Sequence, residues 1–248
     1  MTGPHACPDA TVVVHPTRQA LADAAAARLV VALVDALAVR EVAHVSMTGG
    51  SMGSEIVRSL VALPARDAVD WGRVHVWWGD ERYLPAGDPD RNDTQNDAAG
   101  LSTLCLDPAN VHRVPGPDAT GSAEEAAATY AHTVRSTGTG AFDVMVLGVG
   151  PDGHIASLFP HHPAAGTQGE IAVAVHDSPK PPPDRVSLTL ECLERSREVW
   201  FLVSGADKAD AVRRGVQGSP FAETPAAHVR GQERTLWLVD HDAAADLG

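Results

Sequence analysis

The chain has 248 residues, and its 19 Lys and Arg against 32 Asp and Glu give a formal net charge of −13. With 44% hydrophobic and 21% charged residues, the composition is that of a globular protein and argues against wholesale disorder. The acidic balance disfavours a nucleic-acid partner, because a phosphate backbone requires a basic face. A chain of this length can bury a large core, and we expect one domain spanning residues 1–248.

The cysteines and the N-terminus predict where the protein works. Cys7, Cys105 and Cys192 are widely spaced and form no C-x-x-C pair, which disfavours a disulfide framework or a structural zinc site. The segment Met1–Ala10 lacks a basic patch followed by an apolar core, so no signal peptide is predicted. No apolar run approaches the roughly 20 residues of a membrane span. We therefore expect a cytoplasmic protein with no membrane partner.

The first half of the chain alternates strand patterns with helical patterns. β-Branched and apolar runs predict strands, and apolar residues at helical spacing predict helices. In chain order the elements are a strand at Thr11–His15, a helix that begins near Pro16-Thr17, a strand at Ala43–Thr48, a helix at Ser54–Leu63 and a strand at Val74–Trp78. The segment Leu84–Asp93 is rich in Pro, Gly, Asp and Asn and is predicted to be a loop.

The second half continues the alternation. Ser122 with Glu125 predicts a capping box for a helix through about Val134. Strands are then predicted at Phe142–Leu147, Ile171–Val175, Arg185–Thr189, Val199–Val203 and Thr235–Val239, and helices at Leu190–Ser196 and Asp207–Gly215. This order indicates βαβ units in an α/β protein with an open, mostly parallel, doubly wound sheet and helices on both faces.

Ligands bind outside the carboxyl ends of the strands in such sheets. This rule selects three loops that directly follow strands: Gly49–Gly53, Gly79–Arg82 and Gly148–His154. In the first loop, Gly49, Gly50 and Ser51 precede a helix and would suit a phosphate cradle. The same residues also fit G-x-S-x-G, the nucleophile elbow of serine hydrolases, or a simple tight turn.

The second loop gathers acids and a base at the end of a strand. Asp80, Glu81 and Arg82 could take part in proton transfer or bind a polyol or a phosphate. The alternative is a solvated turn, because exposed charged tripeptides are common.

The third loop matches G-x-G-x-x-G, which raises the question of a dinucleotide site. Pro160 follows closely, which leaves no room for the crossover helix that would bind a pyrophosphate. The better interpretation centres on His154, with Asp152 two residues earlier, as a general base. His161 and His162 raise the question of a metal site, but adjacent histidines flanked by prolines are more typical of a surface loop. We predict no metal.

Two cations stand at the starts of later elements. Arg185 opens a predicted strand, and Lys208 lies at the start of a predicted helix. Both could be ordinary surface residues. Together with the Gly49–Ser51 turn, however, they would complete an anion pocket in an acidic protein.

Five segments taken together resemble a known family. They are GGS (49–51), WWGDERYLP (77–85), FDVMVLGVGPDGHIASLFP (142–160), RVSLTL (185–190) and SGADKA (204–209). From about Val12 to Val239 the chain resembles the 6-phosphogluconolactonases of the glucosamine-6-phosphate isomerase/6-phosphogluconolactonase family. Glucosamine-6-phosphate deaminases are similar through G-x-G-x-D-G-H but continue with F-N-E-P. Here Ser157-Leu158-Phe159-Pro160 follow, so the acid of the deaminases is missing.

The resemblance implies hydrolysis of 6-phospho-D-glucono-1,5-lactone to 6-phospho-D-gluconate in the oxidative pentose phosphate pathway, without a metal or other cofactor. His154 would activate water, with Asp152 as its neighbour and Arg82 facing the reacting end or the phosphate. The residues implied to bind substrate or phosphate are Gly49, Gly50, Ser51, Asp80, Asn92, Arg185 and Lys208. Asn92 follows Arg91, where the family commonly has a serine.

Three other functions stay open at this point. They are a deaminase-like enzyme acting on an aldose or ketose phosphate, a serine esterase using Ser51, and a non-enzymatic sugar-phosphate-binding protein. In each case we expect a small-molecule partner and a monomer or small homo-oligomer.

Overall fold

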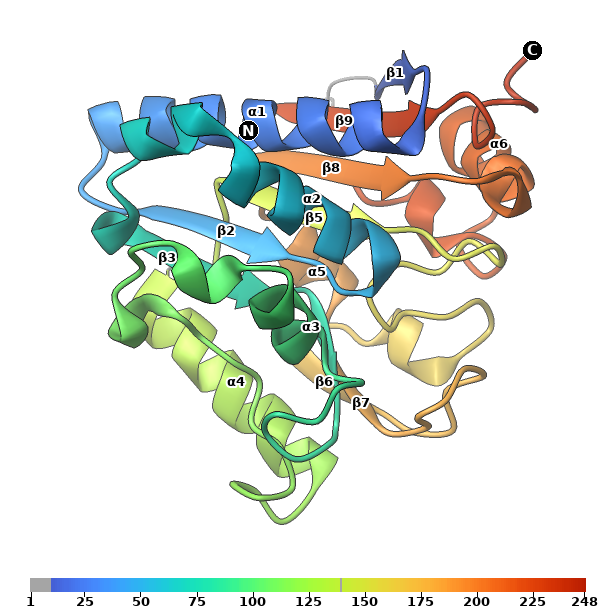
Figure 1. Cartoon of the computed structure of the whole chain (residues 1–248). Coiled ribbons are helices and arrows are strands. Elements are labelled where there is room, and N and C mark those ends of the chain that lie inside the picture. The colour runs from blue at the N-terminus through green and yellow to red at the C-terminus, as the bar shows by residue number, and fades with distance from the viewer. Residues whose placement is uncertain (1–9, 139) are drawn as a thin grey trace, which may run out of the picture.

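The computed structural model describes residues 10–138 and 140–248 (Figure 1). Cys7 and most of the Met1–Ala10 segment lie outside the described residues, as do the first nine residues of the expected domain. None of the described helices, the 22-residue α1 (Arg18–Val39) included, has the length and apolar character that crossing a membrane requires.

Six parallel strands form the main sheet, in the spatial order β1–β9–β8–β5–β2–β3. Their bounds are β1 Thr11–His15, β2 Ala43–Met47, β3 Val74–Trp78, β5 Val144–Gly148, β8 Glu198–Val203 and β9 Arg234–Asp240. From β2 the chain moves outward to β3, and from β5 it moves the other way to β8. The predicted doubly wound, mostly parallel sheet is thereby confirmed, and it has a topological switch point between β2 and β5.

Helices cover both faces of this sheet (Figure 1). Side chains alternate between two apolar clusters along each central strand, as expected for a strand buried on both faces. Val144 and Val146 of β5 pack in the cluster formed with α1 and α2 (Gly50–Ala62), whereas Met145 and Leu147 pack in the cluster formed with α4 (Ala123–Gly138) and α6 (Ala209–Gln217).

A second, smaller sheet corrects part of the sequence-based expectation. It is antiparallel and has the order β4–β7–β6, with β4 at Asp80–Arg82, β7 at Arg185–Leu188 and β6 at Ala172–Val175. The strands predicted near 171–175 and 185–189 therefore exist, but they do not join the parallel sheet. The segment Gly79–Arg82, predicted as a loop, is mostly strand, because β4 pairs with β7 more than 100 residues away: Asp80 faces Ser187 and Arg82 faces Arg185.

Helix boundaries show where local patterns were insufficient. The helix predicted from Ser54 begins at Gly50, so the glycine-rich turn itself forms the first turn of α2. The predicted loop Leu84–Asp93 ends at the start of α3 (Asn92–Ala98). The remaining differences are that α4 extends past Val134, that α5 is only Leu190–Leu193, and that a short 3₁₀ turn precedes α6.

Candidate active site

A cavity of about 350 Å³ opens at the carboxyl ends of the central parallel strands. Its walls come from the carboxyl ends of β2, β5 and β8 and the segments that follow them, which are residues 48–52, 148–150 and 202–204. The small antiparallel sheet closes the other side with Asp80, Arg82 and Arg185. The cavity therefore lies at the switch point of the sheet, where ligands bind in folds of this type.

The glycine-rich turn forms one wall of the cavity. Gly50 has φ of +69°, a conformation that L side chains rarely adopt. A Cβ on Gly49 would lie 1.7 Å from Oδ1 of Asn92, so only glycine allows this close approach. Ser51 is exposed, borders the cavity and lies in the first turn of the 13-residue α2. The N-terminal end of such a helix favours an anion, in keeping with a phosphate cradle.

His154 borders the cavity and is tied to Asp152. His154 Nδ1 lies 2.5 Å from Oδ1 of Asp152, and the ring packs 4.5 Å from that of Phe159. A Cβ on Gly150 would lie 2.1 Å from the His154 ring, which explains a glycine there. With Nδ1–H donating to the carboxylate, Nε2 is left as a proton acceptor. Asp152 itself does not border the cavity, so its contact with substrate would be through His154.

The surroundings favour a neutral His154 and an ionised Asp152. Burial lowers the pKa of His154, and the hydrogen bond to Asp152 only partly opposes this shift. Burial alone would raise the pKa of Asp152, but the hydrogen bond from His154 and the nearby Lys180 hold it well below its usual range. A neutral imidazole beside an ionised carboxylate is the protonation state that a general base needs at neutral pH.

Arg185 is 4% exposed, and most of its hydrogen bonds go to main-chain carbonyl oxygens. Its Nη2 donates to the carbonyls of Lys180 and Pro181 at 2.9 and 3.1 Å, and its Nε to that of Pro182. Its Nη1 lies 3.9 Å from Oδ2 of Asp80, a carboxylate oxygen that also accepts from Ser157 Oγ at 2.6 Å. Arg185 thus fixes the loop 180–182 as well as facing the cavity.

Asn92 and Arg82 reach the cavity from either side of the loop that precedes α3. Asn92 Nδ2 donates to the carbonyl of Asp80 at 2.8 Å, and its Oδ1 is a buried acceptor without a described partner. Arg82 Nη1 donates to the carbonyl of Asp90, while its Nε has no described partner. Both residues border the cavity, and each has one buried polar atom without a described partner.

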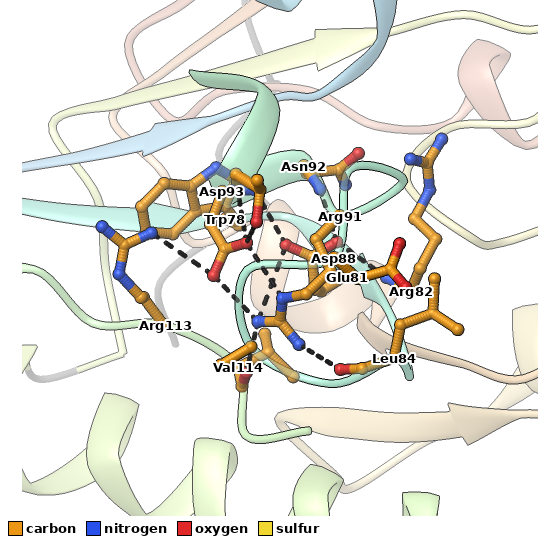
Figure 2. Close-up of polar contacts among 12 residues, drawn as sticks. Trp78, Glu81, Arg82, Leu84, Asp88, Arg91, Asn92, Asp93, Arg113 and Val114 are labelled. Atoms are coloured by element: carbon orange, nitrogen blue, oxygen red, sulfur yellow. Dashed lines mark hydrogen bonds and ion pairs between the residues drawn. The ribbon is translucent and has the colours of Figure 1, made fainter. Parts of the chain in front are cut away.

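A buried network of charged side chains, formed by Glu81, Arg91 and Asp93, lies beside Asn92 (Figure 2). Arg91 is 1% exposed and binds Asp93 through two hydrogen bonds of 2.9 and 2.8 Å. Glu81 accepts from the backbone N–H groups of Asn92 and Asp93 at 2.7 and 2.9 Å. Burial and the Asp93 charge raise the pKa of Glu81, against the opposing effect of Arg91. Glu81 and Arg91 therefore fix the start of α3, and with it Asn92.

Two lysines complete the positive charge around the cavity. Lys208 has Asp207 as its carboxylate neighbour, with Nζ 3.6 Å from Oδ2. Lys180 also borders the cavity, and the sequence analysis did not single it out, because it belongs to none of the motifs considered there. A signal existed: Lys180 lies between two prolines and five residues before Arg185, which positions it through backbone hydrogen bonds.

The structure brings nearly all the predicted site residues to one cavity. It also bears on the dinucleotide, metal and serine-nucleophile interpretations of the sequence. No long helix follows Gly148–His154, only turns and a 3₁₀ segment at Pro163–Gly166, so the dinucleotide interpretation is wrong. His162 Nε2 donates to the carbonyl of His176 instead of joining His154. Within residues 10–138 and 140–248, no cluster of three or more His, Cys, Asp or Glu could hold a metal ion, and no hydrogen bond joins Ser51 to a histidine.

The fold and the cavity define a class: an α/β protein whose strand ends gather cations, a glycine-rich turn and an Asp–His pair, as a site for a small phosphorylated ligand requires. Residues 16–237 match the family model described as glucosamine-6-phosphate isomerases/6-phosphogluconolactonase. The chain belongs to this family.

Individual relatives cover almost the whole chain. A Streptomyces coelicolor protein named 6-phosphogluconolactonase is 47% identical over 245 residues, or 95% of this chain and 94% of its own length. A Mycobacterium tuberculosis protein of the same name is 42% identical over 244 residues, or 96% of this chain and 98% of its own. The crystal structure of 6-phosphogluconolactonase from Thermotoga maritima is similar with a TM-score of 0.81 and 27% identity, covering 93% of this chain and 100% of that one.

Proposed function

We propose that this protein hydrolyses 6-phospho-D-glucono-1,5-lactone to 6-phospho-D-gluconate, with His154 as the general base. The observation that carries the proposal is the Asp152–His154 pair, with its 2.5 Å hydrogen bond, at the edge of a cavity surrounded by cations. The near-full-length relatives named 6-phosphogluconolactonase support the choice of substrate.

The reaction fits the groups available. A δ-lactone is an activated ester, so it needs a positioned water, a base and a positive charge near the developing oxyanion. His154 Nε2 would take a proton from the attacking water while Asp152 stabilises the imidazolium that forms. General-base catalysis supplies about 10²–10⁴-fold, a sufficient share for a reaction that already proceeds slowly in water.

The phosphate would bind at the far end of the cavity. Lys208, the backbone of Gly49–Ser51 at the start of α2 and the remaining donors of Arg185 are the groups proposed to hold it. Asp80, Asn92 and Arg82 would contact the sugar between the phosphate and the lactone carbonyl. Binding energy from this remote phosphate can orient the carbonyl against the activated water.

The test is hydrolysis of freshly generated 6-phosphogluconolactone, measured with and without a chelator and corrected for spontaneous opening. We expect turnover that the chelator does not change. Glucosamine 6-phosphate in a parallel assay distinguishes the deaminase-like alternative, which the sequence disfavours because Ser157–Pro160 carries no acid. Absence of lactone hydrolysis by the well-folded protein would contradict the proposal.

We further propose that the enzyme works without a cofactor, in the cytoplasm, as one domain and as a monomer or small homo-oligomer, with no nucleic-acid partner. The net charge of −13 supports the last point. Size-exclusion chromatography with light scattering tests the oligomeric state.

A further inference from the structure

Lys180 differs from the other cations of the cavity in what lies beside it. Its Nζ is 3.5 Å from Nδ1 of His154 and 3.7 Å from Oδ1 of Asp152. The carboxylate already makes a 2.5 Å hydrogen bond to the imidazole, so the ammonium has only a long contact with it. The side chain is 39% exposed and borders the cavity. Lys180 therefore places a positive charge next to His154, and its ammonium group can still donate hydrogen bonds to a ligand.

Two other cations of the cavity, Arg185 and Arg82, use side-chain donors on main-chain carbonyls, whereas Lys208 lies beside Asp207. Arg185 uses its Nη2 and Nε on the backbone of the 180–182 loop, and Arg82 uses Nη1 on the carbonyl of Asp90. Neither has a described hydrogen bond or ion pair to His154 or Asp152. The reacting carbonyl must lie within reach of His154, because the base acts on the water that attacks it. Among the cations that border the cavity, Lys180 is the one with a described side-chain contact to the Asp152–His154 pair, which it reaches on the Nδ1 side of the imidazole.

We propose that Lys180 is a catalytic residue whose ammonium group binds the lactone carbonyl oxygen and stabilises the oxyanion that develops on it. This inference rests on the proposed hydrolysis. The main chain of the loop supports it, because Ser178 Oγ accepts from the N–H of Lys180 and Arg185 holds its carbonyl. A cation fixed by its backbone but free at its head suits a charge that appears only in the transition state.

The step balances without any other reactant. The water oxygen bonds to the lactone carbon, its proton passes to His154 Nε2, and the C=O electron pair moves onto the oxygen beside Lys180. Collapse of this intermediate breaks the ring C–O bond, and the proton on His154 goes to the departing ring oxygen. The resulting carboxylic acid ionises, and its carboxylate then lies beside Lys180.

The charges around this pair predict a second signature. Asp152 and Asp80 act to raise the pKa of His154, whereas burial and Lys180 lower it. Lys180 in turn faces Asp152, Lys208 and Arg185. Removal of the Lys180 charge should therefore raise the pKa of His154 and move the acidic limb of the pH–rate profile to higher pH. This shift reports how close the Lys180 charge lies to His154, whereas the oxyanion role is tested by kcat.

Kinetics of K180M and K180R provide the first test. K180M keeps the length of the side chain without the charge, and loss of one oxyanion donor predicts a fall in kcat of about 100-fold with little change in KM. K180R keeps the charge and should retain clearly more activity, with the acidic limb at the wild-type position. Wild-type kcat in K180M, or equal losses and an unshifted limb in both variants, overturns the proposal.

Binding measurements provide a second test that does not depend on turnover. By calorimetry, K180M should bind 6-phosphogluconate about tenfold more weakly while glucitol 6-phosphate, which has no carboxylate, binds as before. Equal weakening of both ligands would make Lys180 a phosphate ligand and overturn the proposal, as would no weakening of either. A wild-type protein that binds both ligands but opens no lactone would instead contradict the proposed function itself.

Discussion

One charged cluster lies at the edge of the cavity and another supports its wall, and they differ in how completely their members are paired. In the Glu81–Arg91–Asp93 network, Arg91 and Glu81 are each 1% exposed, and Arg91 makes two hydrogen bonds to Asp93 (Figure 2). In the Asp152–His154–Lys180 cluster, the side chains of Asp152 and Lys180 are 35% and 39% exposed, and the lysine has only long contacts. Both clusters combine carboxylates with cations, but only the second leaves groups free.

The comparison teaches what each arrangement can do. A buried, fully paired charge network holds backbone in one place, because every alternative leaves an unpaired charge in a dry interior. A partly paired cluster at the edge of a cavity keeps donors and acceptors for a ligand. The first cluster thus supports Asn92, and the second is suited to proton transfer. The following experiments test this division from the largest expected effect to the smallest.

Replacement of the base should have the largest effect. His154→Asn should lower kcat by about 10²-fold or more, because it removes the group proposed to take the proton of the water. The affinity for 6-phosphogluconate should remain close to that of the wild type, since the proposed phosphate site does not include His154. The checks are kcat corrected for spontaneous hydrolysis, and calorimetry. Full activity in the purified variant would end the general-base assignment.

Replacement of Arg91 should act on stability instead. Arg91→Met removes the buried cation that lies between Glu81 and Asp93, and loss of one partner of a buried pair costs about 3–5 kcal/mol. Arg113→Met is the matched control, because Arg113 also lies 3.4 Å from Asp93 but its side chain is 39% exposed. It should cost at most about 1 kcal/mol. Denaturant unfolding measures both, and equal losses would show that the network is not closed as described.

The phosphate site should show itself in KM. Lys208→Ala should raise KM for the phosphorylated lactone by about 10- to 100-fold, the value of one charge-assisted contact. Turnover of unphosphorylated gluconolactone should change little. Arg185→Ala should also lower kcat, because Arg185 holds the backbone of the loop that carries Lys180. If Lys208→Ala loses activity equally on both lactones, Lys208 does not bind the phosphate.

Replacement of Ser51 separates a cradle from a nucleophile. Ser51→Ala should keep substantial kcat with at most a rise of a few-fold in KM, because the backbone N–H groups of the turn remain (about 1 kcal/mol for one neutral hydrogen bond). Inactivation of the wild type by a fluorophosphonate with label on Ser51, together with an inactive Ser51→Ala, would favour the serine esterase.

The pH dependence should show the smallest effect near neutrality. Burial lowers the pKa of His154 below its ordinary 6.5, and the neutral imidazole is the form that the proposed general base requires. The rate is therefore retained above this pKa and lost as the pH falls through it, so more than half of the maximal kcat/KM should remain at pH 6.5. Asp152→Asn removes a charge that raises the pKa, so its acidic limb should move to lower pH. A wild-type midpoint above 6.5 would contradict the environment described for His154.

The sequence by itself determined the alternation of strands and helices and the loops that carry the chemistry. Apolar periodicity is a local property, so β1 and β3 have the bounds that the sequence predicted. The rule that ligands bind at the carboxyl ends of parallel strands then placed Gly49–Ser51 and His154 at one edge. Those positions need no knowledge of distant contacts, since each loop directly follows its own strand.

Only the tertiary structure decided how remote segments complete the site. The pairing of β4 with β7 joins residues more than 100 positions apart, and it places Asp80 near Arg185. Lys180 reaches His154 across 26 residues because Arg185 fixes its loop. Arg91 could not be recognised as buried until Glu81, Asp93 and the start of α3 had come together around it. Such contacts depend on the packing of elements that no local pattern encodes, which is why the sequence pointed to His154 but not to the lysine beside it.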